Sequence, residues 1–244
     1  MRVVLLDNRD SFVYNLVDQF ASLGAGIEVY RSTAAASTVM AALAPTAAER
    51  AAGQRPVLCL SPGPGHPRTS GCLMELVEAA LVSAVPTLGI CLGFQAIVEA
   101  CGGSVGPVGP VHGRSVRVEV TEAGRADPAF LPLAGGPLDV ARYHSLGTRA
   151  LPAALTCLAR TYPSHPSHDG VDRARPDGAA TVAPVGDLGG TGPATAPAPG
   201  IVMAARHVSA PLVGLQFHPE SVLTPQGPAI LRALTQDLAR PAPR

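Results

Sequence analysis

The stretch Pro86-Thr-Leu-Gly-Ile-Cys-Leu-Gly-Phe-Gln-Ala-Ile-Val-Glu-Ala100 sets a cysteine between a short apolar run and a helical segment. Pro86–Ile90 is predicted to be a buried strand and Leu92–Ala100 a helix. Cys91 then occupies a Gly-x-Cys-x-Gly turn that presents a nucleophile at the end of a strand. The helix N-terminus stabilises a thiolate, and the Leu92 backbone N–H points to where an oxyanion would form. Taken alone, the pentapeptide fits a buried core cysteine beside flexible glycines equally well.

A second motif, Gln216-Phe-His-Pro-Glu-Ser221, contains a base and an acceptor that can orient it. A thiol needs a base to hold it as a thiolate and then to protonate the leaving amine. His218 and Glu220 are two residues apart, which places both side chains on one side of an extended or turning chain. Alone they fit a capping histidine and a solvated glutamate. Together with Cys91 they favour a nucleophile–base–carboxylate triad.

The segment Ser61-Pro-Gly-Pro-Gly65 follows another apolar run and is called the Pro-Gly loop below. Alternating glycine and proline give a rigid turn with exposed backbone amides, which suits a second oxyanion donor. A simple tight turn is the structural alternative. No Gly-x-x-x-x-Gly-Lys sequence is present, and no Gly-x-Gly-x-x-Gly follows the first strand, which argues against a nucleotide site.

Outward from these motifs, apolar strands alternate with helical segments. This order predicts an α/β fold with a mostly parallel sheet and helices on both faces, and with mixed strand directions in the second half. The expected strands are Val3–Leu6, Ile27–Tyr30, Val57–Leu60, Pro86–Ile90, Arg117–Thr121, Ala141–His144, Leu155–Ala159, Ile201–Arg206 and Leu212–Gln216, and the expected helices are Ser11–Leu23, Cys72–Ser83, Leu92–Ala100 and Pro228–Ala239. In the first helix, Phe12, Leu16, Phe20 and Leu23 have the spacing of a buried face.

Composition excludes several classes of function. All 18 basic residues among the 244 are arginine, and 18 acidic residues balance them. A catalytic lysine is therefore excluded, and a neutral balance argues against nucleic-acid binding. Five cysteines without Cys-x-x-Cys spacing fit neither a disulfide framework nor a zinc site. No secretory signal or membrane span is recognisable, so we expect a cytoplasmic protein without membrane contacts.

The segment Pro163–Gly200 differs from the rest of the chain. Its 38 residues include seven prolines and seven glycines but only four large aliphatic residues. Such a segment cannot bury enough apolar surface to offset the cost of ordering its backbone. We expect a flexible insertion, at about 163–200, within one domain that spans residues 1–244. His165 and His168 lack a third ligand type, so no metal site is predicted.

The motifs together resemble those of the class I, triad-type glutamine amidotransferases. Within that family the resemblance is strongest to the amidotransferase subunits of anthranilate synthase and aminodeoxychorismate synthase. It implies a flavodoxin-like, three-layer fold and covers nearly the whole chain apart from roughly 163–199. The motifs that carry it occur in family order: Asp7-Asn-Arg-Asp-Ser-Phe12, Ser61-Pro-Gly-Pro-Gly65, Gly89-Ile-Cys-Leu-Gly-Phe-Gln95, His112-Gly-Arg114, Arg142-Tyr-His-Ser-Leu146 and Gln216-Phe-His-Pro-Glu-Ser221.

The resemblance assigns roles to individual residues. It implies that Cys91 attacks the carboxamide of L-glutamine, that His218 acts as general base and acid, and that Glu220 orients His218. It implies an oxyanion hole formed by the amides of Leu92 and Gly63, with the loop over Gly63, Pro64 and Gly65 closing on the substrate. It further implies that the glutamine α-amino and α-carboxylate groups are held by Gln95, Ser145 and Leu146. No cofactor is expected in this subunit, and a magnesium ion is expected only in the synthase partner.

Two positions depart from the usual family pattern. Arg114 stands where relatives carry lysine, which keeps the charge but changes its geometry. Arg9 stands where relatives carry an aromatic residue, in a segment that lies near the partner in the family. We expect the first change to affect loop or partner contacts more than hydrolysis, and the second leaves the identity of the partner less certain.

The family delivers ammonia to a chorismate-binding synthase subunit in a hetero-oligomer. The segments Gln95–Ala100 and Leu223–Gly227 favour anthranilate synthase component II, in tryptophan biosynthesis. An aminodeoxychorismate synthase subunit of the folate pathway and a specialised-metabolite relative are the alternatives. A noncatalytic subunit that only stabilises a synthase, and a hydrolase of another γ-glutamyl substrate, are alternatives of other classes. The complete set of Cys91, His218 and Glu220 argues against the noncatalytic subunit.

Overall fold

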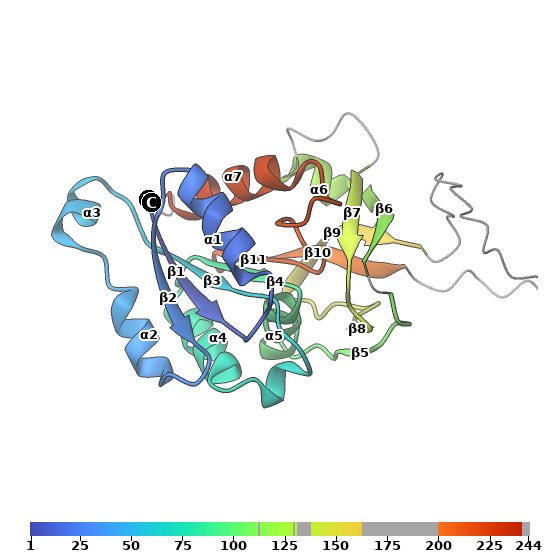
Figure 1. Ribbon diagram of the computed structural model, residues 1–244, viewed down its shortest axis with the longest axis horizontal. Helices are drawn as coiled ribbons and strands as arrows, with labels where there is room; N and C mark the ends of the chain where they lie inside the picture. The colour runs from blue at the N-terminus through green and yellow to red at the C-terminus, as the bar shows by residue number, and fades with distance from the viewer. Residues whose placement is uncertain (112, 129, 131–137, 163–199, 241–244) are drawn as a thin grey trace, which may run out of the picture.

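A mixed sheet crosses the molecule, with the strand order β2-β1-β3-β4-β11-β10-β9-β6-β7 (Figure 1). The computed structural model describes residues 1–111, 113–128, 130, 138–162 and 200–240. The first five strands in this order are parallel to one another, whereas the last four pair in antiparallel fashion. Their bounds are β2 (Gly26–Arg31), β1 (Arg2–Asp7), β3 (Val57–Leu60), β4 (Thr87–Ile90), β11 (Leu212–Leu215), β10 (Ile201–His207), β9 (Leu155–Thr161), β6 (Arg114–Val120) and β7 (Leu138–Arg142).

Helices cover both faces of the sheet, so the molecule has three layers. Successive side chains of a strand point to opposite faces, and β1 shows the consequence. Val3 and Leu5 pack in one core with α1 (Val13–Ser22) and α7 (Gly227–Leu238). Val4 and Leu6 pack in the other with α2 (Ala36–Ala42), α4 (Leu73–Val82) and α5 (Leu92–Ala100). The predicted α/β architecture is confirmed, including the mixed strand directions of the second half (Figure 1).

Several short elements were not predicted. They are the helices α2, α3 (Ala47–Ala51) and α6 (Glu122–Ala126), the 3-10 turn η1 (Pro67–Thr69), and a small second sheet of β5 (Gly106–Pro107) with β8 (Leu146–Gly147). The expected face of the first helix also needs correction. Leu16 and Phe20 are buried, but α1 begins only at Val13 and Phe12 is 41% exposed. Phe12 lies instead against the ring of Tyr143, with centroids 5.7 Å apart.

The predicted insertion falls between two paired strands. Residues 163–199 lie outside the described part of the chain, so their expected flexibility stays a prediction. The flanking residues Thr161 and Ile201 pair directly as the ends of β9 and β10. Gly200 is buried, and its carbonyl oxygen accepts a hydrogen bond from Arg160 Nη1 at 2.8 Å. The insertion therefore begins and ends at the same place, where the chain leaves β9 and enters its antiparallel neighbour β10.

The carboxyl ends of β1, β3 and β4 meet at one edge of the sheet. The chain runs from these ends into residues Asn8–Phe12, the Pro-Gly loop and Cys91. In a sheet of order 2-1-3, the crevice beside β1 and β3 is the usual place for a ligand, because the connections there leave in opposite directions. Among the described residues, no helix is long and apolar enough to cross a membrane.

Candidate active site

Cys91 lies at the turn between β4 and α5, in a backbone conformation that side chains rarely adopt. Its φ is 51° and its ψ is −97°. Gly89 and Gly93 allow this turn, because a Cβ at Gly89 would come within 2.6 Å of the Gly93 backbone. A Cβ at Gly93 would lie 2.3 Å from the carbonyl oxygen of Leu60. The structure thus forms the strained turn expected from the Gly-x-Cys-x-Gly sequence, here called the nucleophile elbow (Gly89–Gly93).

The Pro-Gly loop packs directly against the nucleophile elbow. A Cβ at Gly63 would lie 2.6 Å from Asn8 and 2.9 Å from the Leu92 side chain. Asn8 holds the loop in place: its backbone N–H donates to Ser61 Oγ and its side-chain amide donates to the Ser61 carbonyl, each at 2.9 Å. The two residues expected to provide oxyanion donors, Gly63 and Leu92, are therefore neighbours in space.

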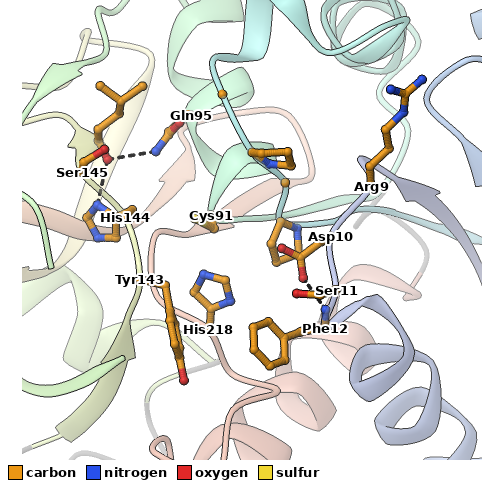
Figure 2. Close-up of a pocket in the computed structure, with 15 residues that line it drawn as sticks. Arg9, Asp10, Ser11, Phe12, Cys91, Gln95, Tyr143, His144, Ser145 and His218 are labelled. Atoms are coloured by element: carbon orange, nitrogen blue, oxygen red, sulfur yellow. Dashed lines mark hydrogen bonds between the residues drawn. The ribbon is translucent and has the colours of Figure 1, made fainter. Parts of the chain in front are cut away.

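His218 and Glu220 form a buried pair next to Cys91. The two side chains are hydrogen bonded between Nδ1 and Oε1 at 2.7 Å, and the residues are 3% and 4% exposed. Burial disfavours the charged imidazolium, but Cys91 and Glu220 together outweigh it and raise the pKa of His218 well above its usual range. Because Glu220 engages Nδ1, Nε2 is the nitrogen left for proton transfer with Cys91, which lies beside the ring (Figure 2).

The position of His218 is set from the antiparallel half of the sheet. Its backbone N–H donates to the carbonyl of Ala141, at the end of β7, at 3.2 Å. Thr224 Oγ1 donates to the His218 carbonyl at 2.7 Å and accepts from the Ala141 N–H at 2.9 Å. The Tyr143 ring packs edge-on against the imidazole, with centroids 4.9 Å apart. His218 follows the parallel strand β11, and these contacts tie it to the end of the antiparallel strand β7.

A cavity of about 410 Å³ opens over Cys91 and His218. This volume lies within the range typical of small-molecule sites, about 300–1,000 Å³. Of the predicted site residues, the cavity is lined by Gly63, Pro64, Gly65, Cys91, Gln95, Ser145, Leu146 and His218 (Figure 2). Leu92 and Glu220 do not line it. They lie behind the nucleophile and the base, where both are buried.

Another part of the cavity wall carries Gln95 and residues 144–146. Gln95 Nε2 donates to the carbonyl of Leu146 at 2.9 Å, and His144 Nδ1 lies 2.7 Å from the same oxygen. A carbonyl can only accept, so His144 carries its proton on Nδ1. Burial, together with the nearby Arg142, lowers the pKa of His144 to about 3. His144 is therefore a neutral, fixed part of the wall.

The remaining lining residues bring charge and aromatic surface to the mouth of the cavity. Asp10 accepts a hydrogen bond from the Phe12 N–H at 2.7 Å, and burial raises the pKa of its carboxyl group. Arg9 has a φ of 63° and extends away from Cys91 (Figure 2). Arg114, the other departure from the family pattern, is exposed at the start of β6 and does not line the cavity; its motif neighbour His112 lies outside the described residues.

The geometry suits thiol chemistry. A nucleophile at a helix N-terminus, a base held by a carboxylate, and two backbone amides are the parts required for acyl transfer. Within the described part of the chain, no group of three histidine, cysteine, aspartate or glutamate side chains is arranged to hold a metal ion. His165 and His168 are outside that part.

Sequence reasoning missed several residues that build the site. Asn8, Tyr143, His144 and Gln216 lie inside the quoted motifs, but the sequence offered no physical reason to give them roles. Thr224 lies in the Leu223–Gly227 segment, which was used only to favour one branch of the family. Each of them contacts a partner more than fifty residues away in the chain or a backbone carbonyl that only folding brings into reach.

Comparisons with known proteins agree with this geometry. The family model described as glutamine amidotransferase class-I matches residues 4–171 and 193–237. An anthranilate synthase component 2 of Corynebacterium glutamicum is 38% identical over 97% of each chain. A pyocyanine-specific anthranilate synthase component 2 of Pseudomonas aeruginosa is 38% identical over 95% of this chain and 91% of its own.

Solved structures agree on the fold. A glutamine amidotransferase from Thermotoga maritima superposes with a TM-score of 0.62, covering 98% of this chain and 97% of its own. The two sequences are 16% identical, so this match is evidence about the fold alone. The family model and the relatives are evidence of family membership, because their matches include both the nucleophile elbow and the His218 motif. The chain belongs to the class I glutamine amidotransferase family.

Proposed function

We propose that this chain hydrolyses L-glutamine to glutamate and supplies the ammonia to a chorismate-binding synthase subunit that makes anthranilate. The observation that carries the proposal is the placement of Cys91 at a strained elbow beside the buried pair of His218 and Glu220, under a cavity of about 410 Å³. The names of the full-length relatives support anthranilate as the product.

The proposed reaction follows from the positions of the groups. The Cys91 thiolate attacks the side-chain carboxamide carbon of glutamine, and the resulting oxyanion accepts hydrogen bonds from the Leu92 and Gly63 amides. His218 Nε2 gives its proton to the leaving nitrogen, so that ammonia departs and a γ-glutamyl thioester remains. His218 then takes a proton from the water that attacks the thioester carbonyl. Breaking the C–S bond restores the Cys91 thiolate beside a protonated His218 and releases glutamate, whose carboxyl proton goes to solvent. Glu220 stabilises the imidazolium throughout.

The glutamine backbone groups are proposed to bind the wall formed by Gln95, Ser145 and Leu146, with Pro64 and Gly65 covering the substrate. No cofactor is proposed for this subunit, and magnesium is expected only in the synthase. The cytoplasmic location expected from the sequence is part of the same proposal.

The pathway is the finer part of the proposal. We favour tryptophan biosynthesis, on the basis of the relative from C. glutamicum. The pyocyanine-specific relative has the same identity, which makes a specialised pathway the specific alternative. A folate-pathway subunit would produce aminodeoxychorismate instead. Identifying the synthase that copurifies with this chain, and its product from chorismate, separates these assignments.

The central test uses Cys91→Ala in the complex with the synthase. Glutamine-dependent synthesis is expected to fall to background, while synthesis from added ammonium salt stays within about twofold of the wild type, because the thiol acts only on glutamine. Equal loss of both activities would overturn the role of Cys91.

Two further measurements separate the alternative classes. A glutamine analogue that alkylates thiols is expected to label Cys91; absence of labelling in the complex would favour the noncatalytic subunit. Glutamate release from free glutamine is expected to exceed release from γ-glutamyl peptides. The reverse order would favour a hydrolase of another substrate.

A further inference from the structure

Gln216 forms a hydrogen-bonded connection between the nucleophile and the wall of the cavity. Its side-chain Nε2 donates to Cys91 Sγ at 3.7 Å, and its Oε1 accepts from Gln95 Nε2 at 3.3 Å. The residue directly follows β11 and is fully buried. Its backbone N–H donates to the Met203 carbonyl at 2.9 Å. Gln216 is therefore fixed in place behind Cys91 and does not itself line the cavity.

The orientation of the Gln216 amide is determined by the backbone. Gln95 Nε2 donates to the carbonyl of Leu146, so the amide end of Gln95 faces both Leu146 and Gln216. A carbonyl oxygen only accepts and an NH₂ group only donates, so Gln216 must turn its oxygen toward Gln95. Its NH₂ group is then directed at Cys91 Sγ. The direction of donation, from Gln216 to the sulfur, follows from the fixed acceptor at Leu146.

A donor at this position has a clear chemical consequence. Cys91 is 7% exposed, so little water is available to solvate a charge on its sulfur. A buried charge is stable only where hydrogen bonds or an opposite charge replace water. His218 supplies the opposite charge on one side, and the Gln216 amide supplies a neutral donor on another. A donor that is not consumed in proton transfer can stay with the sulfur through every step.

We propose that Gln216 is a further catalytic residue, which stabilises the Cys91 thiolate and links it to Gln95 in the glutamine-binding wall. The catalytic role of Gln216 rests on the proposed function, because it requires that Cys91 attacks glutamine. The hydrogen bond to the sulfur can be tested without any glutamine, which keeps the two proposals separable.

Two variants divide the contacts of Gln216. Gln216→Met has a similar length but neither donor nor acceptor, so both contacts are lost. Gln216→Glu keeps an oxygen toward Gln95 and places a second oxygen, instead of a donor, against the sulfur. Gln54→Met is the control, because Gln54 is exposed and lies outside the site. Urea unfolding of each full-length variant shows whether it is folded under the assay conditions.

The decisive measurement is the pH profile of Cys91 alkylation by iodoacetamide, followed on the Cys91 peptide by mass spectrometry. The other titratable or charged groups around the sulfur are His218, with Glu220 behind it, and Arg9, Asp10, Tyr143 and His144 in the cavity wall. Both variants keep these groups, and Gln216→Glu adds one carboxyl group beside the sulfur. Loss of a hydrogen bond to a charged group is expected to move the midpoint of the profile up by about one pH unit in Gln216→Met. In Gln216→Glu the midpoint is expected to rise by at least as much, because the new carboxylate also repels the thiolate. Gln54→Met is expected to match the wild type.

Glutamine hydrolysis in the synthase complex supplies the second measurement. Gln216→Glu is expected to lower kcat about tenfold and leave KM within about threefold, since the contact with Gln95 remains. Gln216→Met is expected to lower kcat and also to raise KM. An alkylation midpoint within about 0.3 pH units of the wild type in folded variants would overturn the inference, whatever happens to kcat. If the wild type itself failed to hydrolyse glutamine, the proposed function would fail, while the alkylation profile would still decide the role of Gln216 toward the sulfur.

Discussion

Replacing Gly93 by alanine tests whether close packing at the nucleophile elbow controls both stability and activity. Gly93 lies in α5, where alanine is intrinsically favoured over glycine by up to about 1 kcal/mol. The surroundings predict the opposite effect. A Cβ at this position would lie 2.3 Å from the carbonyl oxygen of Leu60 and 2.6 Å from its Cβ. These atoms belong to β3 and cannot rotate away, so α5 must move off the sheet.

The expected cost follows from this displacement. Overpacking in a well-packed interior costs about 1–3 kcal/mol, and a clash with backbone belongs at the upper end. After the gain in helix propensity, we expect the free energy of unfolding to fall by about 2 kcal/mol. The same movement separates Leu92, at the start of α5, from Gly63, which follows β3. A misplacement of about 1 Å at a reacting group can lower the rate about 100-fold, so glutamine hydrolysis is expected to fall far more than stability.

Urea unfolding followed by circular dichroism measures the first effect, and glutamate release in the synthase complex measures the second. Gly26→Ala is the matched control, because no atom lies within 4 Å of a Cβ there and its φ is not positive. Its stability is expected to stay within about 0.5 kcal/mol of the wild type. A Gly93→Ala variant with the same free energy of unfolding as the wild type, and the same slope of that free energy against urea concentration, would refute the packing argument.

Two other predictions concern the titratable groups of the site. Glu220→Gln removes the charged partner from the 2.7 Å hydrogen bond to His218. We expect kcat for glutamine hydrolysis to fall about 10- to 100-fold with KM nearly unchanged, whereas a fall of less than about threefold would contradict the role of the carboxylate. The pKa of His144 is lowered to about 3 from an ordinary 6.5, so between these values the unfolded chain binds a proton that the folded protein does not. The free energy of unfolding is therefore fully retained above pH 6.5 and falls as the pH drops toward 3. In urea unfolding between about pH 6.5 and pH 4, the wild type is expected to lose stability more steeply than His144→Gln, by at most about 1.4 kcal/mol per pH unit; parallel profiles would contradict this.

Most of the regular elements could be predicted because their signals are local. Apolar runs such as Val57–Leu60 are buried on both faces of a parallel sheet, and the run of residues alone identifies them. The helix α3 was missed although its start carries a recognisable capping box, in which Thr46 and Glu49 bond each other's backbone N–H. Phe12 was placed on a buried face because helical spacing says nothing about where a helix begins. The ring of Tyr143, 131 residues away in the chain, is what it contacts.

The sequence by itself determined the α/β class and the strand–Cys91–helix turn, and it supplied the candidates for the thiol, base and carboxylate. These depend on neighbouring residues and on chemical type, both of which can be read from the chain. Only the tertiary structure decided that β11 lies between β4 and β10, which brings His218 beside Cys91 across 127 positions. It also decided the hydrogen bonds from Leu146 through Gln95 and Gln216 to the sulfur. Those hydrogen bonds join residues from separate elements. The orientation of the two amide groups follows only when the fold brings the Leu146 carbonyl, which can only accept, to Gln95.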